Sequence, residues 1–206
     1  MLPAELETRA QVDFERYGGF NKGRPMQPVE LRAGTPSVPD PLYPLPNFGA
    51  GGNMSFRTAA LHAIGGFDNR LGCPAIHGGE ETLALSQVLD GGSVILHWPP
   101  AVTWHYHRRT DEELERQFFG YSAGLTAFYT SVILSSPKSV FRILAFIPRG
   151  LKQIQATHGD GRPEGPPAGF PKSLLRAGRR GLYRGPWLYL REARRHRRTR
   201  LPRQQV

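Results

Sequence analysis

The sequence predicts an α/β fold in which helices cover a mixed layer of strands and a helical extension follows at the carboxyl end. Two runs rich in β-branched and aromatic residues begin at Ser93 and Val102 and predict two strands, which Pro99 and Pro100 separate. Helical apolar periodicity precedes and follows these runs. With 206 residues, 39% of them hydrophobic, the chain is long enough to bury a core.

The amino-terminal part predicts one helix and one long loop. Apolar side chains recur at steps of three and four over residues 2–17 and predict an amphipathic helix that ends at Gly18 and Gly19. Closely spaced prolines in residues 20–48 exclude the interior of a regular helix or strand. A long connecting loop is therefore expected there.

Two helices are predicted between this loop and the strands. The glycine-rich residues 49–53 predict a bend, and a brief helix follows that is capped by Thr58 and closed by Gly65 and Gly66. A second helix is predicted over residues 80–89, where an Asp-Gly-Gly sequence ends it.

Helices are also predicted after the strands. Acidic residues in the first turn support a helix over residues 111–134. Residues 118–137 carry no charge and approach the length of a bilayer span, but their glycines, serines and threonines favour a packed or interfacial helix. The apolar face of the next helix, residues 138–154, either packs on the preceding helix or lies flat on a membrane.

Composition divides the chain into four parts. Residues 1–135 form the α/β body, 136–158 an amphipathic helical segment, 159–171 a linker rich in Pro and Gly, and 172–206 a basic tail that is helical or disordered. The tail holds twelve of the 27 Lys and Arg residues but one of the 17 acids, so it carries the net charge of +10. It either contacts anionic lipid or stays solvated. Because no nucleic-acid-binding module accompanies this charge, no nucleic-acid partner is expected.

Cysteine content and the first residues indicate the compartment. The lone Cys73 excludes an internal disulfide and a multi-cysteine zinc site, which fits a reducing environment. The amino terminus carries acids where an export signal needs a basic start and an apolar run. We therefore expect a cytoplasmic protein, either free or peripheral on the inner face of the plasma membrane.

Three clusters hold candidate functional residues. In the first, GAGGNMSFR, Gly51 and Gly52 allow the backbone to approach a ligand, and Asn53 offers a donor and acceptors. The alternative interpretation is a tight turn. In the second, HGGEETLAL, Glu80 and Glu81 begin a helix. Adjacent helical side chains diverge, so one is expected to bind or orient while the other acts as a base. Alternatively, both only stabilise the helix terminus.

The third cluster is WHYHRR. If it is a strand, His105 and His107 point to the same face, which suits contact with a metal ion or a phosphate. Alternatively, the two histidines form a polar strand face.

In this order, GGNMSFR, GGFD, GGEE and VTWHYHRR resemble the second half of bacterial family 2 glycosyltransferases of the GT-A fold. The family pattern is G-x-N-x-x-F/R, GGFD, a GGED-type acid pair and a W-H-x-H-R-like run. The opening ELETRAQVDFERYGGF and the later RQFFGYSAGLTAFY look like an actinobacterial branch and extend the resemblance over residues 6–134. It implies that residues 1–135 form the carboxyl-terminal half of a GT-A, Rossmann-like domain.

The resemblance implies transfer of a sugar from a nucleotide-sugar donor to a hydroxyl of a glycan or lipid-linked acceptor in cell-envelope synthesis. By position, Glu81 is the general base beside Glu80, and His105 is a ligand of Mg²⁺ or Mn²⁺. Such a base contributes about a hundredfold to ten-thousandfold in rate, and the cation stabilises the departing diphosphate. The substrate-binding residues implied are Gly51, Gly52, Asn53, His107, Arg108 and Arg109.

Two departures qualify this assignment. Glu81 replaces the usual aspartate, and Ala84 stands where the family commonly has an acid. No D-x-D motif for metal and nucleotide occurs in the chain. The donor-binding half is therefore expected to be missing by truncation or encoded as a separate chain, which would leave this chain weak or inactive alone. The alternative is a non-catalytic module, membrane-peripheral or partner-binding, that keeps the acceptor-side fold.

Overall fold

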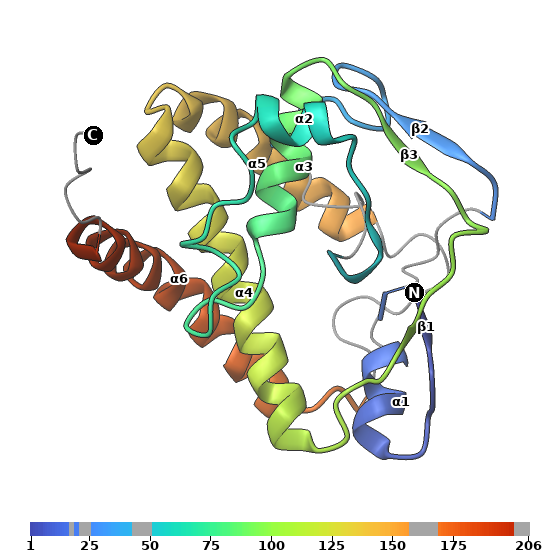
Figure 1. The fold of residues 1–206 in the computed structure, drawn as a ribbon. Helices are drawn as coiled ribbons and strands as arrows, with labels where there is room; N and C mark the ends of the chain where they lie inside the picture. Colours follow the sequence, from blue (N-terminus) through green and yellow to red (C-terminus); the bar gives the residue numbers. More distant parts are fainter. Residues whose placement is uncertain (17–18, 21–25, 43–50, 157–168, 200–206) are drawn as a thin grey trace.

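The computed structural model describes residues 1–16, 19–20, 26–42, 51–156 and 169–199. The predicted linker, residues 159–171, lies largely outside these ranges. Helices dominate the described part, beside two small sheets (Figure 1). The elements are β1 (Leu2–Pro3), α1 (Arg9–Arg16), β2 (Val29–Leu31), the 3-10 helix η1 (Gly51–Asn53), α2 (Thr58–Ala63), α3 (Glu80–Asp90), β3 (Ile95–His97), β4 (Trp104–His105), α4 (Asp111–Ser135), α5 (Ser139–Ala156) and α6 (Lys172–Thr199).

The strands form two separate pairs. β1 pairs in parallel with β4, and β2 pairs antiparallel with β3. The prediction that residues 20–48 contain no regular strand is wrong at β2, where three residues between the prolines form a ladder with β3. The predicted strands at Ser93 and Val102 therefore exist as β3 and β4, but they do not pair with each other in one mixed layer. The assignment to half of a GT-A domain stays a prediction.

The amino-terminal helix is shorter than the sequence predicts. It was expected over residues 2–17, but α1 begins at Arg9. The N–H groups of Leu2 and Ala4 instead donate to the carbonyl oxygens of Thr103 and His105. These long-range hydrogen bonds satisfy the backbone as an extended strand, although the apolar spacing suits a helix.

The brief helix α2 also differs in its cap. Thr58 is its first helical residue, Arg57 occupies the N-cap position, and no side chain caps the helix.

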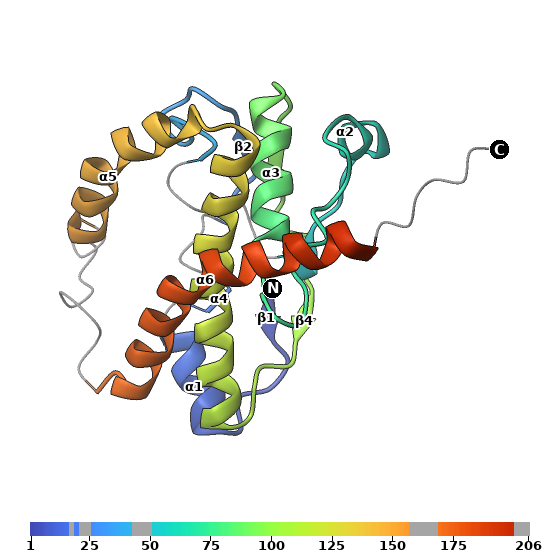
Figure 2. The same cartoon turned by 90° about the vertical axis from the view of Figure 1, so that its left-hand side faces the viewer.

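Helix α4 forms the centre of the molecule, and α6 crosses it at close range (Figure 2). Glycines on α6 allow this approach: Gly181 lies against the carbonyl oxygen of Phe119, and Gly185 lies against that of Ala123. In the part of the chain that the structure describes, no helix combines the length and apolar character needed to cross a membrane.

The main core joins α4 and α6 to the other elements. Tyr189 of α6 and Phe128 of α4 are both fully enclosed. The part of α6 from Leu174 to Tyr189 is thus packed into the body rather than forming a separate tail. The buried members of this core are Leu42, Leu71, Ile76, Leu83, Ala123, Ala127, Phe128, Phe146, Leu188 and Tyr189.

The GGFD turn fastens α6 to α4. Asp68 accepts hydrogen bonds from Arg70 at 2.7 Å, from the hydroxyl of Tyr189 at 3.1 Å and from Ser131 at 3.2 Å. Burial alone would raise the pKa of Asp68, but the hydrogen bonds from Arg70 and Tyr189 outweigh it and lower that pKa. In this structure the motif has a packing role.

Candidate functional site

The acid pair stands at the amino end of α3, after two glycines in left-handed conformations. Gly78 has φ 97° and Gly79 φ 94°. Gly79 also packs on α4, where a Cβ atom would lie 2.7 Å from the carbonyl oxygen of Gly124. Its N–H donates to Oε2 of Glu81 at 3.1 Å. The glycines therefore bring the first turn of α3 against α4 and hold the Glu81 carboxylate at a helix terminus that favours negative charge.

Glu80 and Glu81 have different environments, but their carboxyls do not simply diverge, because Glu81 acts electrostatically on Glu80. Oε2 of Glu80 is buried and has no hydrogen-bond partner in the described part of the chain. Burial, followed by the charge of Glu81, raises the pKa of Glu80 to about 7. Near neutral pH, Glu80 therefore exchanges a proton beside a second carboxyl that is hydrogen-bonded to the backbone.

The glycine-rich cluster lies beside this acid pair. A Cβ atom at Gly51 would be 3.4 Å from Cβ of Glu81, and one at Gly52 would be 3.1 Å from the sulfur of Met1. Nδ2 of Asn53 donates to the carbonyl oxygen of Ala101 at 2.7 Å. η1 thus bridges the start of α3 and the segment between β3 and β4, and it brings the first two clusters together.

A cavity of about 900 Å³ borders η1 at Asn53. Its lining is mainly apolar, with Val88 of α3 and Leu96 of β3 among its walls, and Asn53 and Arg57 supply polar groups. Neither Glu81 nor His105 lines it. Large apolar cavities with few polar groups are common ligand sites, and this one is lined by residues 53–57 of the first cluster and by Leu85 of the second.

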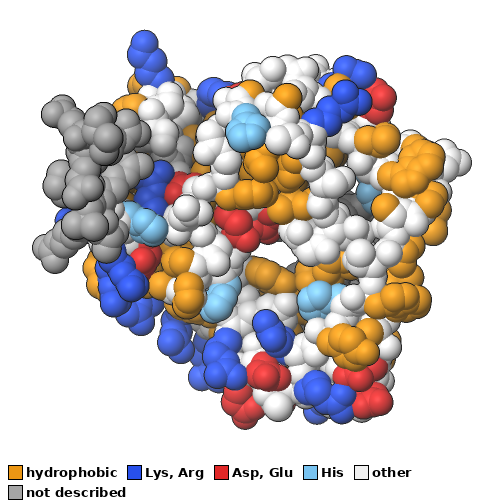
Figure 3. Space-filling model, in the orientation of Figure 1, with side chains coloured by type: hydrophobic (Ala, Val, Ile, Leu, Met, Phe, Trp, Pro, Cys, Tyr) orange, Lys and Arg blue, Asp and Glu red, His pale blue; other side chains and the backbone are white. Residues whose placement is uncertain are grey.

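Acidic and histidine side chains border a hollow in the centre of the face shown in Figure 3.

The hydroxyl of Tyr121, on α4, is affected by charges from both the second and the third cluster. Burial of its hydroxyl raises the pKa of Tyr121, and the hydrogen bond from Gln117 opposes this shift. The charge of Glu81 raises the same pKa and that of Arg108 lowers it, so both side chains lie within electrostatic range of one phenol.

The two histidines of the third cluster contact each other and α1. Nδ1 of His105 lies 3.0 Å from Nδ1 of His107, and Nε2 of His107 lies 2.8 Å from Oε1 of Glu15. Phe14 and Phe20 pack against the ring of His107. Both nitrogens of this buried ring are therefore engaged by the protein, so His107 orients His105 and has none left for a substrate.

His105 is half-buried, and its surroundings favour the neutral ring. Burial, and then the neighbouring charges of His107 and Arg108, lower the pKa of His105. Its Nε2 is the ring nitrogen left after the contact with His107.

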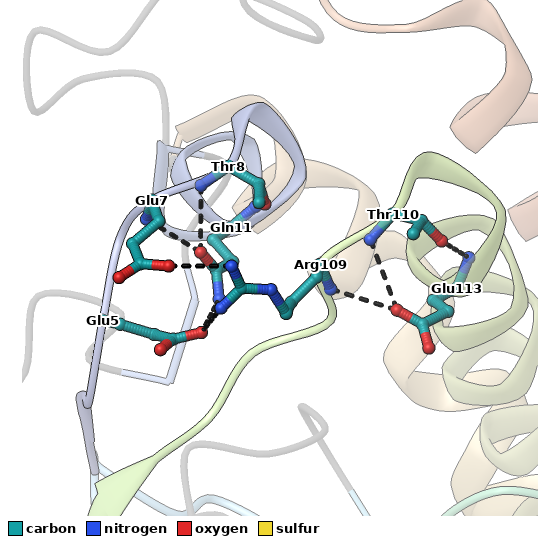
Figure 4. A network of polar contacts seen from close by, with 7 residues as sticks. All are labelled: Glu5, Glu7, Thr8, Gln11, Arg109, Thr110 and Glu113. Atoms are coloured by element: carbon teal, nitrogen blue, oxygen red, sulfur yellow. Dashed lines mark hydrogen bonds and ion pairs between the residues drawn. The ribbon is translucent and has the colours of Figure 1, made fainter.

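The two arginines that follow have different environments. Arg109 forms ion pairs with Glu5 and with Glu7, the latter at 2.7 Å, and its N–H donates to Glu113 (Figure 4). Glu113 also forms a capping box with Thr110 at the start of α4. Arg109 therefore ties the amino-terminal segment to α4. Arg108 is exposed and forms no hydrogen bond or ion pair within the described ranges, so it is the arginine that is available to an anion.

Sequence reasoning missed Glu15 and Tyr121. Glu15 stands 92 positions before its partner His107, so no local pattern could pair the two. Tyr121 lay in a stretch that was interpreted as a packed or interfacial helix, without a role at the site.

The described residues do not complete a metal site. Nowhere among them do three His, Cys, Asp or Glu side chains gather in a geometry that could hold a metal ion. His105 offers one nitrogen, whereas Mg²⁺ requires several oxygen ligands. A divalent cation stays a prediction, and we assign no step to it.

Comparison of the chain with protein-family models, with curated proteins and with solved structures finds no match. The glycosyltransferase assignment therefore depends on the motifs and on the arrangement described above.

Proposed function

We propose that this chain provides the acceptor side of a glycosyltransferase, which transfers a sugar from a nucleotide-sugar donor to a hydroxyl of a glycan or lipid-linked acceptor. One observation carries the proposal: Gly51 lies against Glu81. A backbone that a ligand can approach closely is thereby adjacent to a carboxylate at a helix terminus. We place the reaction in the cytoplasm.

Glu81 is the proposed general base. Its carboxylate, held by the N–H of Gly79, takes the proton of the acceptor hydroxyl as that oxygen bonds to the anomeric carbon of the donor. The bond from this carbon to the diphosphate breaks, and the diphosphate leaves with the electron pair. A positioned base contributes about a hundredfold to ten-thousandfold to such a step.

Arg108 is the proposed anion contact, because it is exposed and unpaired within the described ranges. The sequence contains no D-x-D motif, so we propose that a separate polypeptide supplies the donor-binding residues.

A transfer assay tests the proposal. The chain is incubated with nucleotide sugars and hydroxyl acceptors, with and without candidate donor-binding chains, and nucleoside diphosphate release and product mass are measured. Glu81→Gln is expected to lower the rate at least a hundredfold. Glu112→Gln, which removes an exposed carboxylate elsewhere, is the matched control and is expected to leave the rate unchanged. Full activity of Glu81→Gln would exclude Glu81 as the base.

Acceptor binding can be tested without a donor. On a glycan array, Gly51→Val is expected to abolish binding, because its side chain fills the space beside Glu81. Ala59→Val, at an exposed position of α2 outside the cavity lining, is the control of similar size.

One observation favours a non-catalytic binding module instead. Ala84, where the family commonly has an acid, is 1% exposed and belongs to the core. If this alternative holds, the array detects glycan binding that Gly51→Val abolishes, while the transfer assay shows no turnover with any partner chain.

A further inference from the structure

Helix α6 has one face that is fully used in packing. Leu174, Ala177, Gly181, Leu188 and Tyr189 are buried on this face against α4 and the core. The close contacts of its glycines with α4 hold the helix in a fixed orientation.

The opposite face carries a single continuous stripe of side chains at steps of three and four residues, which is the spacing of one helical face. In its middle stand three apolar or aromatic residues, of which Tyr183 is 85% exposed, Trp187 52% and Leu190 39%. Basic residues flank this group on both sides. The stripe is formed by Lys172, Arg176, Arg179, Tyr183, Trp187, Leu190, Arg194 and Arg197.

Further positive charge lies beside the exposed aromatic group. The guanidinium groups of Arg184 and Arg191 lie 5.8 Å and 5.6 Å from the ring centre of Trp187. Glu192, the single acid of α6, is 5% exposed and lies 3.9 Å from Arg195. The outward stripe therefore contains no negative charge.

The chemistry of this stripe fits an anionic bilayer surface. Tyrosine and tryptophan favour the headgroup layer because one end of each is apolar and the other polar. Arginines on either side of them can bind lipid phosphates. The 28 residues of α6 rise about 42 Å along the helix, and Pro186 lies in its interior, where α6 bends (Figure 2). Each half can lie against a surface with its outward side chains.

We propose that the outward stripe of α6 docks the protein on membranes that contain anionic phospholipids, with the helix axis in the plane of the surface. Tyr183, Trp187 and Leu190 enter the headgroup layer, and the flanking basic residues bind lipid phosphates. This docking does not depend on the transferase proposal.

Vesicle binding tests the charge component. The full chain is floated with vesicles of phosphatidylcholine alone and with vesicles containing phosphatidylglycerol. Binding is expected for the anionic vesicles alone, and it should weaken with salt. Arg176→Gln/Arg179→Gln is expected to weaken binding about 25-fold, roughly fivefold for each charge removed. Arg57→Gln/Lys138→Gln removes two exposed charges elsewhere and is expected to have a much smaller effect.

Insertion of the central residues is tested by Tyr183→Ser/Trp187→Ser/Leu190→Ser. This variant is expected to abolish binding, whereas Phe141→Ser/Leu144→Ser, which removes two exposed apolar residues of α5, is not. Circular dichroism checks that each variant is folded. In Trp98→Phe/Trp104→Phe, which keeps Trp187 as the single tryptophan, fluorescence should shift to the blue with anionic vesicles and be quenched by brominated lipids.

Three results would overturn the proposal: no binding to anionic vesicles, equal binding to both vesicle types, or unchanged binding of the stripe variants. Single-stranded and duplex RNA serve as competitors. If RNA binds more tightly than anionic vesicles and the same substitutions abolish this binding, the stripe is a nucleic-acid surface and the membrane proposal is wrong.

Discussion

The rings of His105 and His107 contact each other through their Nδ1 atoms, which are 3.0 Å apart. In a hydrogen bond between two imidazoles, one nitrogen must donate and the other accept. The carboxylate of Glu15 can only accept, so Nε2 of His107 donates to it. When His107 is neutral, its Nδ1 accepts from the N–H of His105. This order leaves a lone pair on Nε2 of His105.

Glu15 therefore selects the tautomers of both rings. Nitrogen NMR of the histidine side chains at neutral pH is expected to show the proton of His105 on Nδ1 and that of His107 on Nε2. Glu15→Ala should mix these tautomers and lower the free energy of unfolding by about 1–3 kcal/mol, because it removes the acceptor of a buried N–H. Glu15→Gln keeps a carbonyl acceptor and should keep the wild-type pattern. A wild-type His105 protonated on Nε2 would contradict the proposed order.

The raised pKa of Glu80 makes stability depend on pH. In the folded protein this pKa is about 7, compared with an ordinary value of 4.5, so the folded state binds the proton more tightly. The resulting stabilisation is fully present below about pH 4.5 and is lost as the pH rises through 7. Glu80→Gln, which stays neutral, should therefore gain stability relative to wild type between pH 5 and pH 8, by about 1–2 kcal/mol because the group is only partly buried.

Urea denaturation at both pH values measures this effect. Glu112→Gln is the control and should differ from wild type by the same amount at both. Glu81→Gln should move the pH-dependent range to lower pH, because the charge of Glu81 contributes to the raised pKa of Glu80. A constant difference between Glu80→Gln and wild type would show that Glu80 titrates normally.

Substitution of the two glycines before α3 distinguishes the stability cost of backbone strain from that of close packing. Gly78 and Gly79 have nearly equal φ angles, but only at Gly79 would a Cβ atom meet the backbone of Gly124. Gly78→Ala is expected to cost about 1 kcal/mol for the left-handed conformation, and Gly79→Ala should cost at least about 2 kcal/mol more. Equal losses in urea denaturation would mean that α4 moves aside easily.

Local sequence signals were sufficient to predict helix boundaries that are set by residues within or next to the helix. The Asp-Gly-Gly sequence ended the predicted helix at residue 89, one residue before the end of α3. The acidic first turn, which includes Glu113, predicted the helix that begins at Asp111. In the structure, Glu113 forms a capping box with Thr110 at the start of this helix. In both cases the residues that fix the boundary are neighbours in sequence.

Contacts between distant segments could not be predicted in this way. The amino-terminal strand depends on hydrogen bonds from Leu2 to residue 103, and the order of the two histidine protons depends on Glu15. The basic composition of residues 172–206 indicated a separate tail, because positive charge dominated the pattern. The packing of α6 is instead decided by Gly181 and Gly185, whose partners lie about 60 positions earlier on α4.

Substitutions at two glycines of α6, Gly178 and Gly181, test the packing of this helix directly. In a helix interior, alanine is normally about 1 kcal/mol more favourable than glycine. Gly178→Ala should keep most of this gain, because its Cβ atom would lie 3.3 Å from the flexible hydroxyl of Ser122. Gly181→Ala places a Cβ atom against the backbone of Phe119 and Ala123, which must move apart. It is expected to lower the free energy of unfolding by about 2–3 kcal/mol.

Thermal and urea denaturation of the two variants, made in Trp98→Phe/Trp104→Phe and monitored at Trp187, distinguish close helix packing from a loosely attached basic helix. If α6 were loosely attached, both substitutions would stabilise the helix alike, because each would replace a glycine in a solvated helix. Opposite signs for Gly178→Ala and Gly181→Ala are expected only if the backbones of α4 and α6 are in contact at Gly181. That contact also fixes the outward direction of Tyr183, two residues further along the helix.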